Sequence, residues 1–240
     1  MLLLELKKIK RKKLPLIFAI IVIVGTTIQY FMGNMTYNGV AYGNKLGWFF
    51  KNGLTLNSYY LFIPVISLVG MELFVLEGRN NTLKNLLVIP INKKEIMLNK
   101  IYFLFIFTTI YMVITFLSMC LLESMFNANI MSSLFVLSYF LKYLIHGIVC
   151  YILSVFIIMT MLYFKQSIQI TVAVAFVFSF IGVFISQVKI AYVYCVNAMF
   201  YISGEVDSNM FEKTIAGLAI LFLAFLDIKL LAKISHREAL

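Results

Sequence analysis

The sequence predicts an all-α polytopic membrane protein with six transmembrane helices and both termini in the cytoplasm. Three observations lead to this fold class. The 240 residues are 62% hydrophobic and only 12% charged, whereas soluble domains are about half apolar and a quarter charged. Apolar runs of about twenty residues, enough to cross ~30 Å of hydrocarbon, recur along the chain. Most lysines and arginines flank these runs on one predicted side, which the positive-inside rule assigns to the cytoplasm.

The apolar runs define a single transmembrane domain over residues 1–240. We find no internal repeat, soluble domain or low-complexity linker in the sequence. The six predicted spans cover approximately residues 14–33, 59–76, 101–122, 142–164, 168–187 and 214–231.

The chain opens with the basic amphipathic stretch MLLLELKKIKRKK, residues 1–13. We expect an interfacial helix here, with its leucines on the membrane and its lysines and arginine facing lipid phosphates. A signal peptide is the alternative, because a charged start precedes an apolar run. The length of that run and the lack of an Ala-x-Ala-like cleavage site count against it.

Three segments are predicted to lie on the outer side. Residues 34–57 are polar and rich in Gly, Asn and Tyr, which favours a loop at the interface. Residues 124–140 contain an outer turn followed by an interfacial or partly inserted piece, because the apolar run of 134–164 is too long for one upright span. Residues 188–212 read as an amphipathic outer segment, since aromatic residues favour the interface. Residues 165–167 form a short inner turn, and the last residues form a cytoplasmic tail.

The positions of the basic residues support this topology. Five lie on segments not predicted to be inside: Lys45, Lys51, Lys142, Lys189 and Lys213. The other fifteen lie on predicted inner segments: Lys7, Lys8, Lys10, Arg11, Lys12, Lys13, Arg79, Lys84, Lys93, Lys94, Lys100, Lys165, Lys229, Lys233 and Arg237.

The sequence offers no catalytic or metal-binding motif. Cys120, Cys150 and Cys195 lie far apart and form no CxxC pair. His146 and His236 are isolated, so no metal site is predicted. No Gly-x-x-x-x-Gly-Lys-Ser/Thr run is present, so any ATP that drives the protein must bind another chain. The net charge of +10 does not indicate nucleic acid, because the basic residues flank apolar spans.

The longest polar interruption is EGRNNTLKNLLVIPINKKEIMLNK, residues 77–100, between the second and third spans. A short helix is predicted inside it, because Pro90 stops a helical pattern that a short polar side chain can cap. The possible caps are Asn80, Asn81 and Thr82. The apolar stripe is Leu83, Leu86 and Leu87, while Lys84 and Asn85 lie off it. A docking helix for another protein fits this pattern, and so does a basic loop whose leucines lie among lipid headgroups.

The same stretch resembles a known family. It combines Glu77 at the end of a span, the run Gly-Arg-Asn-Asn-Thr-Leu-Lys-Asn-Leu-Leu, the run Ile-Pro-Ile-Asn-Lys-Lys-Glu, and Lys100 entering the next span. This is similar to the coupling-helix region of type-2 ABC exporter permeases, most of all those of lantibiotic-protection (immunity) and bacitracin-resistance transporters. The resemblance implies that residues 80–87 and Pro90 dock into a cleft of a separate ATPase subunit, with Glu77 and Arg79 taking part in coupling.

The resemblance also implies the assembly and its task. Two six-span chains, identical or related, would pair in the plasma membrane of a bacterium. Two copies of a separate ATPase would bind ATP and Mg, leaving no cofactor in this chain. The complex would remove a lantibiotic-like antimicrobial peptide from the membrane. Within residues 188–212 the family implies a half-membrane re-entrant hairpin. The alternative from another class is a stand-alone membrane enzyme or assembly factor without an ATPase.

Glu72 is the one acidic residue well inside a predicted span. Burying its charge costs about 2–4 kcal/mol, so it should be paired, protonated or facing water. It is therefore either a polar point on a translocation path or subunit interface, or a protonated side chain bonded to a neighbouring helix. Glu77 and Asp227 lie near the inner surface, where solvent, Arg79 or the two lysines after Asp227 can balance their charge.

Overall fold

The computed structural model describes residues 14–79 and 93–235, and within them six helices are long and apolar enough to cross a membrane. This confirms the predicted all-helical fold. The membrane-crossing elements are α2 (Leu14–Asn34), α4 (Phe62–Arg79) with the segments preceding it, α6 (Lys93–Asn127), α7 (Ser133–Tyr163), α8 (Ile168–Ile185) and α10 (Met210–Ser235). Residues 1–13, expected as an interfacial helix, lie outside the described part.

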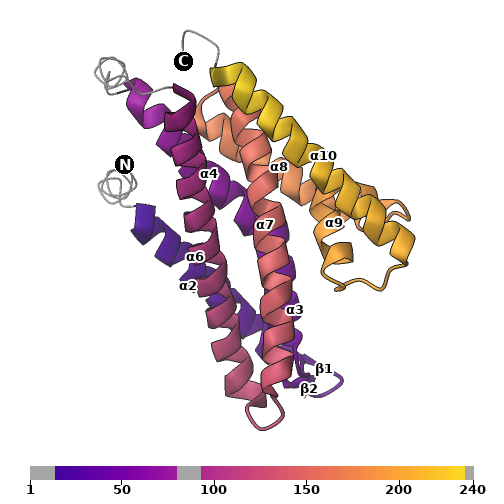
Figure 1. Ribbon diagram of the computed structural model, residues 1–240. Coiled ribbons are helices and arrows are strands. Elements are labelled where there is room, and N and C mark those ends of the chain that lie inside the picture. Colours follow the sequence, from indigo (N-terminus) through magenta and orange to yellow (C-terminus); the bar gives the residue numbers. More distant parts are fainter. Residues whose placement is uncertain (1–13, 80–92, 236–240) are drawn as a thin grey trace.

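The helices alternate in direction, and most of their ends gather at two sides of the bundle, whereas the start of α10 lies beside the middle of α7 (Figure 1). At one side α2 begins, α4 ends, α6 begins and α10 ends. The turn between α7 and α8 lies there too, as expected for residues 165–167. We call this side the terminal end. The opposite side is the hairpin end, where β1 (Thr36–Tyr37) pairs antiparallel with β2 (Val40–Ala41) and the short helix η1 (Tyr42–Asn44) follows.

Residues 34–57 are not only a loop, which corrects the sequence prediction. The helix α3 (Trp48–Leu56) continues through a π-helix, η2 (Asn57–Leu61), into α4, so one helical rod runs from Trp48 to Arg79. The reason is a buried apolar face: Phe49, Phe50 and Leu54 are fully buried. Polar residues on the other face of α3 lower the mean hydropathy of the segment, so the apolar stripe is not apparent from hydropathy alone.

The predicted division of residues 134–164 into an outer piece and a span from residue 142 is not seen, because one helix covers both parts. After a turn, Ser132 caps α7 by accepting a hydrogen bond at Oγ from the Phe135 backbone N at 3.3 Å. The helix then runs without a break for 31 residues. At 1.5 Å per residue α7 is ~46 Å long and α6 is ~52 Å, so both exceed the ~30 Å of hydrocarbon.

Residues 188–212 contain two short helices, η3 (Ala191–Val193) and α9 (Cys195–Ile202). The amphipathic character expected from the sequence is not seen in α9, because the five consecutive residues from Val196 to Phe200 are buried and no residue of the helix is exposed. The helix packs against α7 and α10, and Figure 1 shows α9 beside α10.

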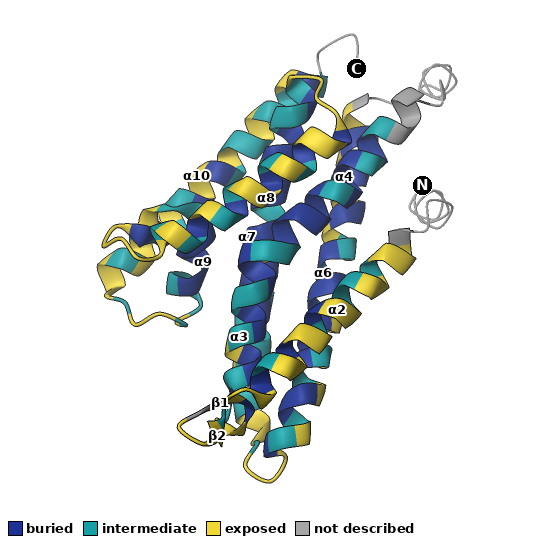
Figure 2. Cartoon of the chain, turned by 180° about the vertical axis from the view of Figure 1, so that it is seen from behind, coloured by how far each residue is buried: buried dark blue, intermediate teal, exposed yellow. Residues whose placement is uncertain are grey.

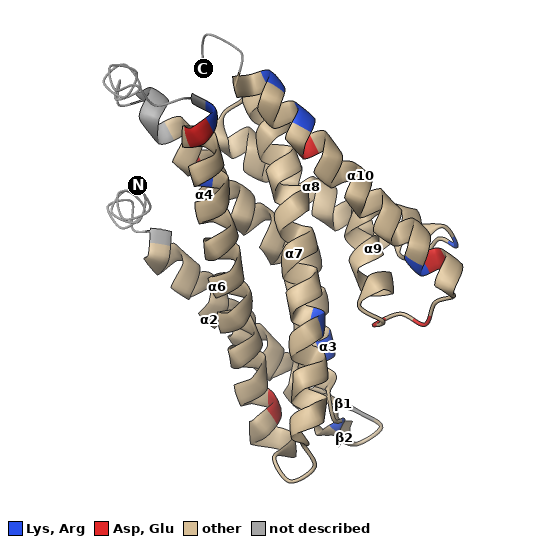
Figure 3. Ribbon diagram, viewed as in Figure 1, with Lys and Arg blue, Asp and Glu red and all other residues tan. Residues whose placement is uncertain are grey.

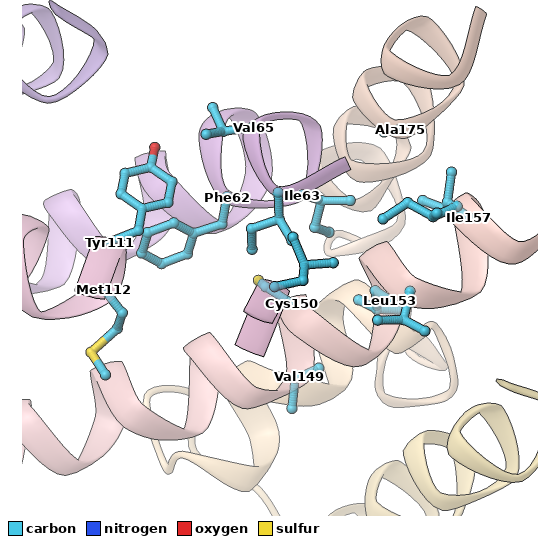
Figure 4. Packing of buried hydrophobic residues seen from close by; sticks show 14 of the residues in the cluster. Phe62, Ile63, Val65, Tyr111, Met112, Val149, Cys150, Leu153, Ile157 and Ala175 are labelled. Atoms are coloured by element: carbon cyan, nitrogen blue, oxygen red, sulfur yellow. The ribbon is translucent and has the colours of Figure 1, made fainter. Parts of the chain in front are cut away.

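Helix α4 lies at the centre of the bundle, packed against α6, α7 and α8. Figure 4 shows Phe62 and Ile63 of α4 facing Tyr111 of α6 and Cys150 of α7, and the Phe62 and Tyr111 rings meet edge to face at 5.1 Å. Gly70 lets the helices approach, because a Cβ there would overlap the side chain of Ile158. In contrast, α2 and α10 have few buried residues (Figure 2), as expected of helices that face lipid.

A buried carboxylate anchors the hairpin end. Glu123 near the end of α6 is fully buried. Its Oε1 accepts hydrogen bonds from the Gly47 backbone N at 2.7 Å and from Asn127 Nδ2 at 2.8 Å, and its Oε2 accepts one from the Phe49 backbone N at 3.2 Å. Gly47 has φ 83°, a left-handed conformation that glycine adopts without strain. The carboxylate therefore caps α3, where the helix dipole favours negative charge.

We expect Glu123→Ala to lower the thermal stability of the purified protein markedly. It leaves the buried backbone N–H groups of Gly47 and Phe49 without an acceptor, and each orphaned group costs about 1–3 kcal/mol. Asn127 Nδ2 keeps its hydrogen bond to the Gly43 carbonyl oxygen. Glu212→Ala is the control, because Glu212 Oε2 accepts a single bond, from the Asn209 backbone N at 3.0 Å, at an exposed site. Equal losses of melting temperature in the two variants would contradict the anchoring role of Glu123.

Charged residues lie at the terminal end and again on α3, α7 and the start of α10 (Figure 3). The described lysines expected inside belong to the terminal end: Lys94, Lys100, Lys165, Lys229 and Lys233. With the terminal end in the cytoplasm, single cysteines replacing Asn44 and Asn209 should label from outside intact cells, in a background without native cysteines. Cysteines replacing Lys93 and His236 should label only after permeabilisation. Labelling of the Lys93→Cys variant in intact cells would overturn this orientation.

Candidate functional site

Glu72 lies on α4 about two turns before the helix ends, half-buried rather than enclosed. Its side chain lines a groove of about 630 Å³ between α4 and α8. Pro64 and Leu68 of α4 complete one wall. The other wall belongs to α8: Ile168, Gln169, Val172, Ala173 and Phe176.

Glu72 makes no hydrogen bond or ion pair with any other described residue. The bonded, protonated glutamate considered from the sequence therefore finds no partner in the described part of the chain. Among the described residues that line the groove, Gln169 is the only other polar one. Glu72 thus places one carboxylate on an otherwise apolar wall, an arrangement suited to a ligand with a cationic and an apolar part.

A second groove, of about 430 Å³, lies farther along the same rod toward the hairpin end. On one side are α2 residues, and on the other are residues of α3 and the π-helix. All the lining residues are apolar or aromatic: Ile20, Ile21, Val24, Gly25, Ile28, Leu56, Tyr60 and Leu61. The described residues of this groove carry no charge, so it suits an acyl chain or the apolar face of a peptide.

Beside the grooves, the π-helix is joined to α9. Tyr59 donates a hydrogen bond from its hydroxyl to Asn197 Oδ1 at 2.9 Å, and its ring stacks on Phe200 with centroids 4.9 Å apart. A π-helix inside an α-helix often marks a functional position. Here it turns a tyrosine toward α9 and breaks the regular hydrogen bonding of the rod.

The same turn is joined to α7 through a buried histidine. His146 Nδ1 lies 2.8 Å from Ser58 Oγ, and its Nε2 lies 3.1 Å from Ser203 Oγ. Ser58 and His146 are fully buried. A serine paired with a histidine can in principle act as nucleophile and base, but this pair has no open surface through which a substrate could reach it. We assign it to holding the π-helix, α7 and the end of α9 together.

An ion-pair cluster lies next to this contact. Lys142 Nζ of α7 is 2.6 Å from Glu205 Oε2, and Lys51 Nζ of α3 is 3.6 Å from Glu205 Oε1. The Glu205 side chain is only 5% exposed. The cluster connects the loop after α9 to α3 and α7. Lys51 and Lys142, two of the five basic residues not predicted to lie on inner segments, therefore take part in this contact.

A comparison with protein families identifies the architecture. The family model described as ABC-2 family transporter protein matches residues 1–182, about three quarters of the chain. The chain belongs to this family. It is therefore a membrane permease of an ABC transporter, a multi-pass membrane protein whose family in general works with an ABC ATPase. Comparisons with curated proteins and with solved structures gave no match.

The match covers both grooves of the ABC-2 permease and ends within α8, before α9 and α10. The predicted ATPase-docking residues, Asn80 to Leu87 and Pro90, lie outside the described part of the chain, as do the side chains of Glu77 and Arg79. The structure places the backbone of both at the end of α4. Helix α4 ends at Arg79 and α6 begins at Lys93, both at the terminal end (Figure 1).

Asp227 does not pair with Lys229 or Lys233, although the sequence allowed either pair. Its Oδ1 is buried and has no hydrogen-bond partner among the described atoms. Lys229 Nζ instead lies over the Phe225 ring at 4.5 Å, and Lys233 Nζ lies over the Tyr163 ring at 4.9 Å. Both lysines point to aromatic faces, where a cation is attracted by the ring quadrupole.

Sequence reasoning missed the contacts around the π-helix and those of Glu123 and Glu205. Their signals are weak, since each pairs residues dozens of positions apart. Within the described residues no group of three or more His, Cys, Asp or Glu side chains could hold a metal ion.

Proposed function

We propose that this permease is the membrane subunit of an ATP-driven exporter that removes a cationic, lantibiotic-like peptide from the plasma membrane of a bacterium. The observation that carries this proposal is the groove between α4 and α8. It combines apolar walls with the carboxylate of Glu72, which pairs with no other described residue. An amphipathic peptide with amino groups has the complementary chemistry, whereas a purely apolar solute does not.

Energy would reach the groove through α4. The wall that carries Glu72 belongs to the helix that ends at Arg79, and α6 begins at Lys93. The thirteen or so residues between them contain the predicted docking helix, with Leu83, Leu86 and Leu87 as its apolar stripe. ATP-driven closure of two ATPase subunits would displace this segment, and the displacement would act on both helices at once.

The resemblance of residues 77–100 to coupling regions supports the remaining parts of the proposal. Two permease chains, identical or related, would pair in the membrane. ATP and Mg would bind the ATPase subunits, and the terminal end of the bundle would face the cytoplasm. The large exposed apolar faces of α2, α8 and α10 leave room for lipid and for a second chain.

The function is tested by export from cells. A sensitive bacterium would express this chain with the ATPase and any second permease from its own gene neighbourhood, and would be exposed to a fluorescent cationic lantibiotic. We expect less cell-associated peptide and a higher inhibitory concentration than in cells whose ATPase lacks its phosphate-loop lysine. Equal peptide retention in the two strains would refute peptide export.

A further inference from the structure

We propose that the two grooves are consecutive binding positions for one substrate along the rod Trp48–Arg79, with Tyr60 between them. We call the two grooves together the track, and we propose that it binds a cationic amphipathic peptide with its amino group at Glu72. This inference rests on the proposed function and adds the binding positions and the residue that separates them.

The rod contributes one wall to each groove. Leu56 and Tyr60 line the apolar groove, and Pro64, Leu68 and Glu72 line the groove with the carboxylate. These five residues follow one another at intervals of four. Each interval turns a regular α-helix about 40° past a full turn, so Leu56 and Glu72 do not lie on one line. The two grooves adjoin at Tyr60 and Pro64, which are about one turn apart across the junction of the π-helix and α4.

Aromatic rings occupy the position between the grooves. Tyr60 lies 5.9 Å, centroid to centroid, from Phe180 of α8. Phe180 in turn stacks on Phe176 at 5.9 Å with an angle of 8° between the rings. Since Tyr60 lines one groove and Phe176 lines the other, these rings separate the two spaces.

Tyr60 belongs to the π-helix, where the backbone departs from regular α-helical bonding. A change of the π-turn would rotate Tyr60 relative to α8 without unfolding the rod. The neighbouring Ser58 and Tyr59 are bonded to α7 and α9, so movement of α9 and movement of Tyr60 are linked through adjacent residues.

Charge and length together select the occupant. Glu72 supplies the one carboxylate and has no described partner, so it favours an amino group. From Glu72 to Leu56 the rod advances sixteen residues, or ~24 Å. A peptide helix of similar length can place its cationic end at Glu72 and its apolar face in the groove beside α2.

The test is photo-crosslinking of the full chain with its ATPase in lipid nanodiscs. A benzophenone amino acid replaces Leu68 in the first groove or Val24 in the second. The probe is a fluorescent amphipathic helix with lysines at one end, and its twin has every lysine acetylated. We expect the probe to crosslink at Leu68 without nucleotide, roughly tenfold more than its twin. Crosslinks at Val24 should appear only during ATP hydrolysis.

Two substitutions sharpen the test. Glu72→Gln should remove the preference for the cationic probe at Leu68. Tyr60→Ala should allow crosslinks at Val24 without ATP, because the ring between the grooves is gone. Phe184→Ala is the control, since Phe184 contacts Phe180 at 5.3 Å on the same helix but lines neither groove. It should behave as the wild type.

Three results would overturn the inference. The first is equal crosslinking of the probe and its acetylated twin at Leu68, and the second is crosslinking at Val24 without nucleotide when Tyr60 is present. The third is complete displacement of the probe by a cationic single-chain lipid at equal concentration. The nucleotide-free experiment at Leu68 does not depend on the ATPase. Its failure therefore counts against the track alone, whereas failure of the chain to bind an ATPase counts against the proposed function.

Discussion

Leu86→Asp should leave the permease in the membrane at normal levels while binding of its ATPase falls by at least tenfold. Leu86 is in the apolar stripe of the predicted docking helix, and a helix this short has little stability of its own without a partner surface. Burying one leucine contributes about 1.5–3 kcal/mol, and aspartate would also place a charge in the interface. The spans of the bundle do not depend on this position.

The measurement is pull-down of the ATPase by tagged variants, with membrane levels quantified in parallel. Lys84→Ala is the matched control, because Lys84 lies in the same segment but off the stripe, and it should bind almost as well as the wild type. If the leucines only rest among lipid headgroups, Leu86→Asp will recruit the ATPase normally, and the docking hypothesis for residues 80–87 fails.

Glu72→Gln should assemble normally and export much less peptide. Glutamine preserves the size of the side chain but removes its charge, and Glu72 makes no described hydrogen bond that folding would lose. Glu72→Leu should export no better, because it removes the polar group from the groove altogether. Loss of one charge-assisted contact corresponds to roughly a tenfold or greater fall in affinity.

Asp207→Asn is a suitable control for this experiment. Asp207 is an exposed acid in the loop between α9 and α10, away from both grooves. Its replacement changes the net charge by the same amount as Glu72→Gln, so export should stay at the wild-type level. Full export activity in Glu72→Leu would show that the carboxylate faces no substrate.

The spans were predictable because each is a long run of apolar residues. The bounds of α2 and α8 agree with the predicted spans to within two residues, since polar turns mark their ends. The second span was predicted too short. Lys51, Asn52 and Thr55 make α3 look like a loop, and the burial of Phe49 and Phe50 that makes it a helix depends on contacts with α6 and α7.

The lengths of α6 and α7 show another limit. Hydropathy locates the part of a helix that can lie in hydrocarbon, but it does not show where the helix itself ends. The residues after Ser132 were expected to lie along the interface, whereas packing of Phe135 and Tyr139 against Phe50 holds them in a continuous helix. Such contacts join residues more than eighty positions apart.

Glu72 was found from the sequence because a charge in an apolar run is conspicuous. Its surroundings were not predictable, since the opposite wall of the groove comes from α8, about a hundred residues later. The contacts of the π-helix were missed for the same reason. Ser58, His146 and Ser203 are each unremarkable in the sequence, and only the fold brings them together.

The most direct test of the account is purification of the tagged chain from its native membrane in mild detergent. We predict that a soluble subunit with a phosphate-binding loop co-purifies, that it hydrolyses ATP, and that the permease stimulates this hydrolysis. A chain that purifies without any ATPase and acts by itself on a lipid or peptide would contradict the assignment and favour a stand-alone membrane enzyme.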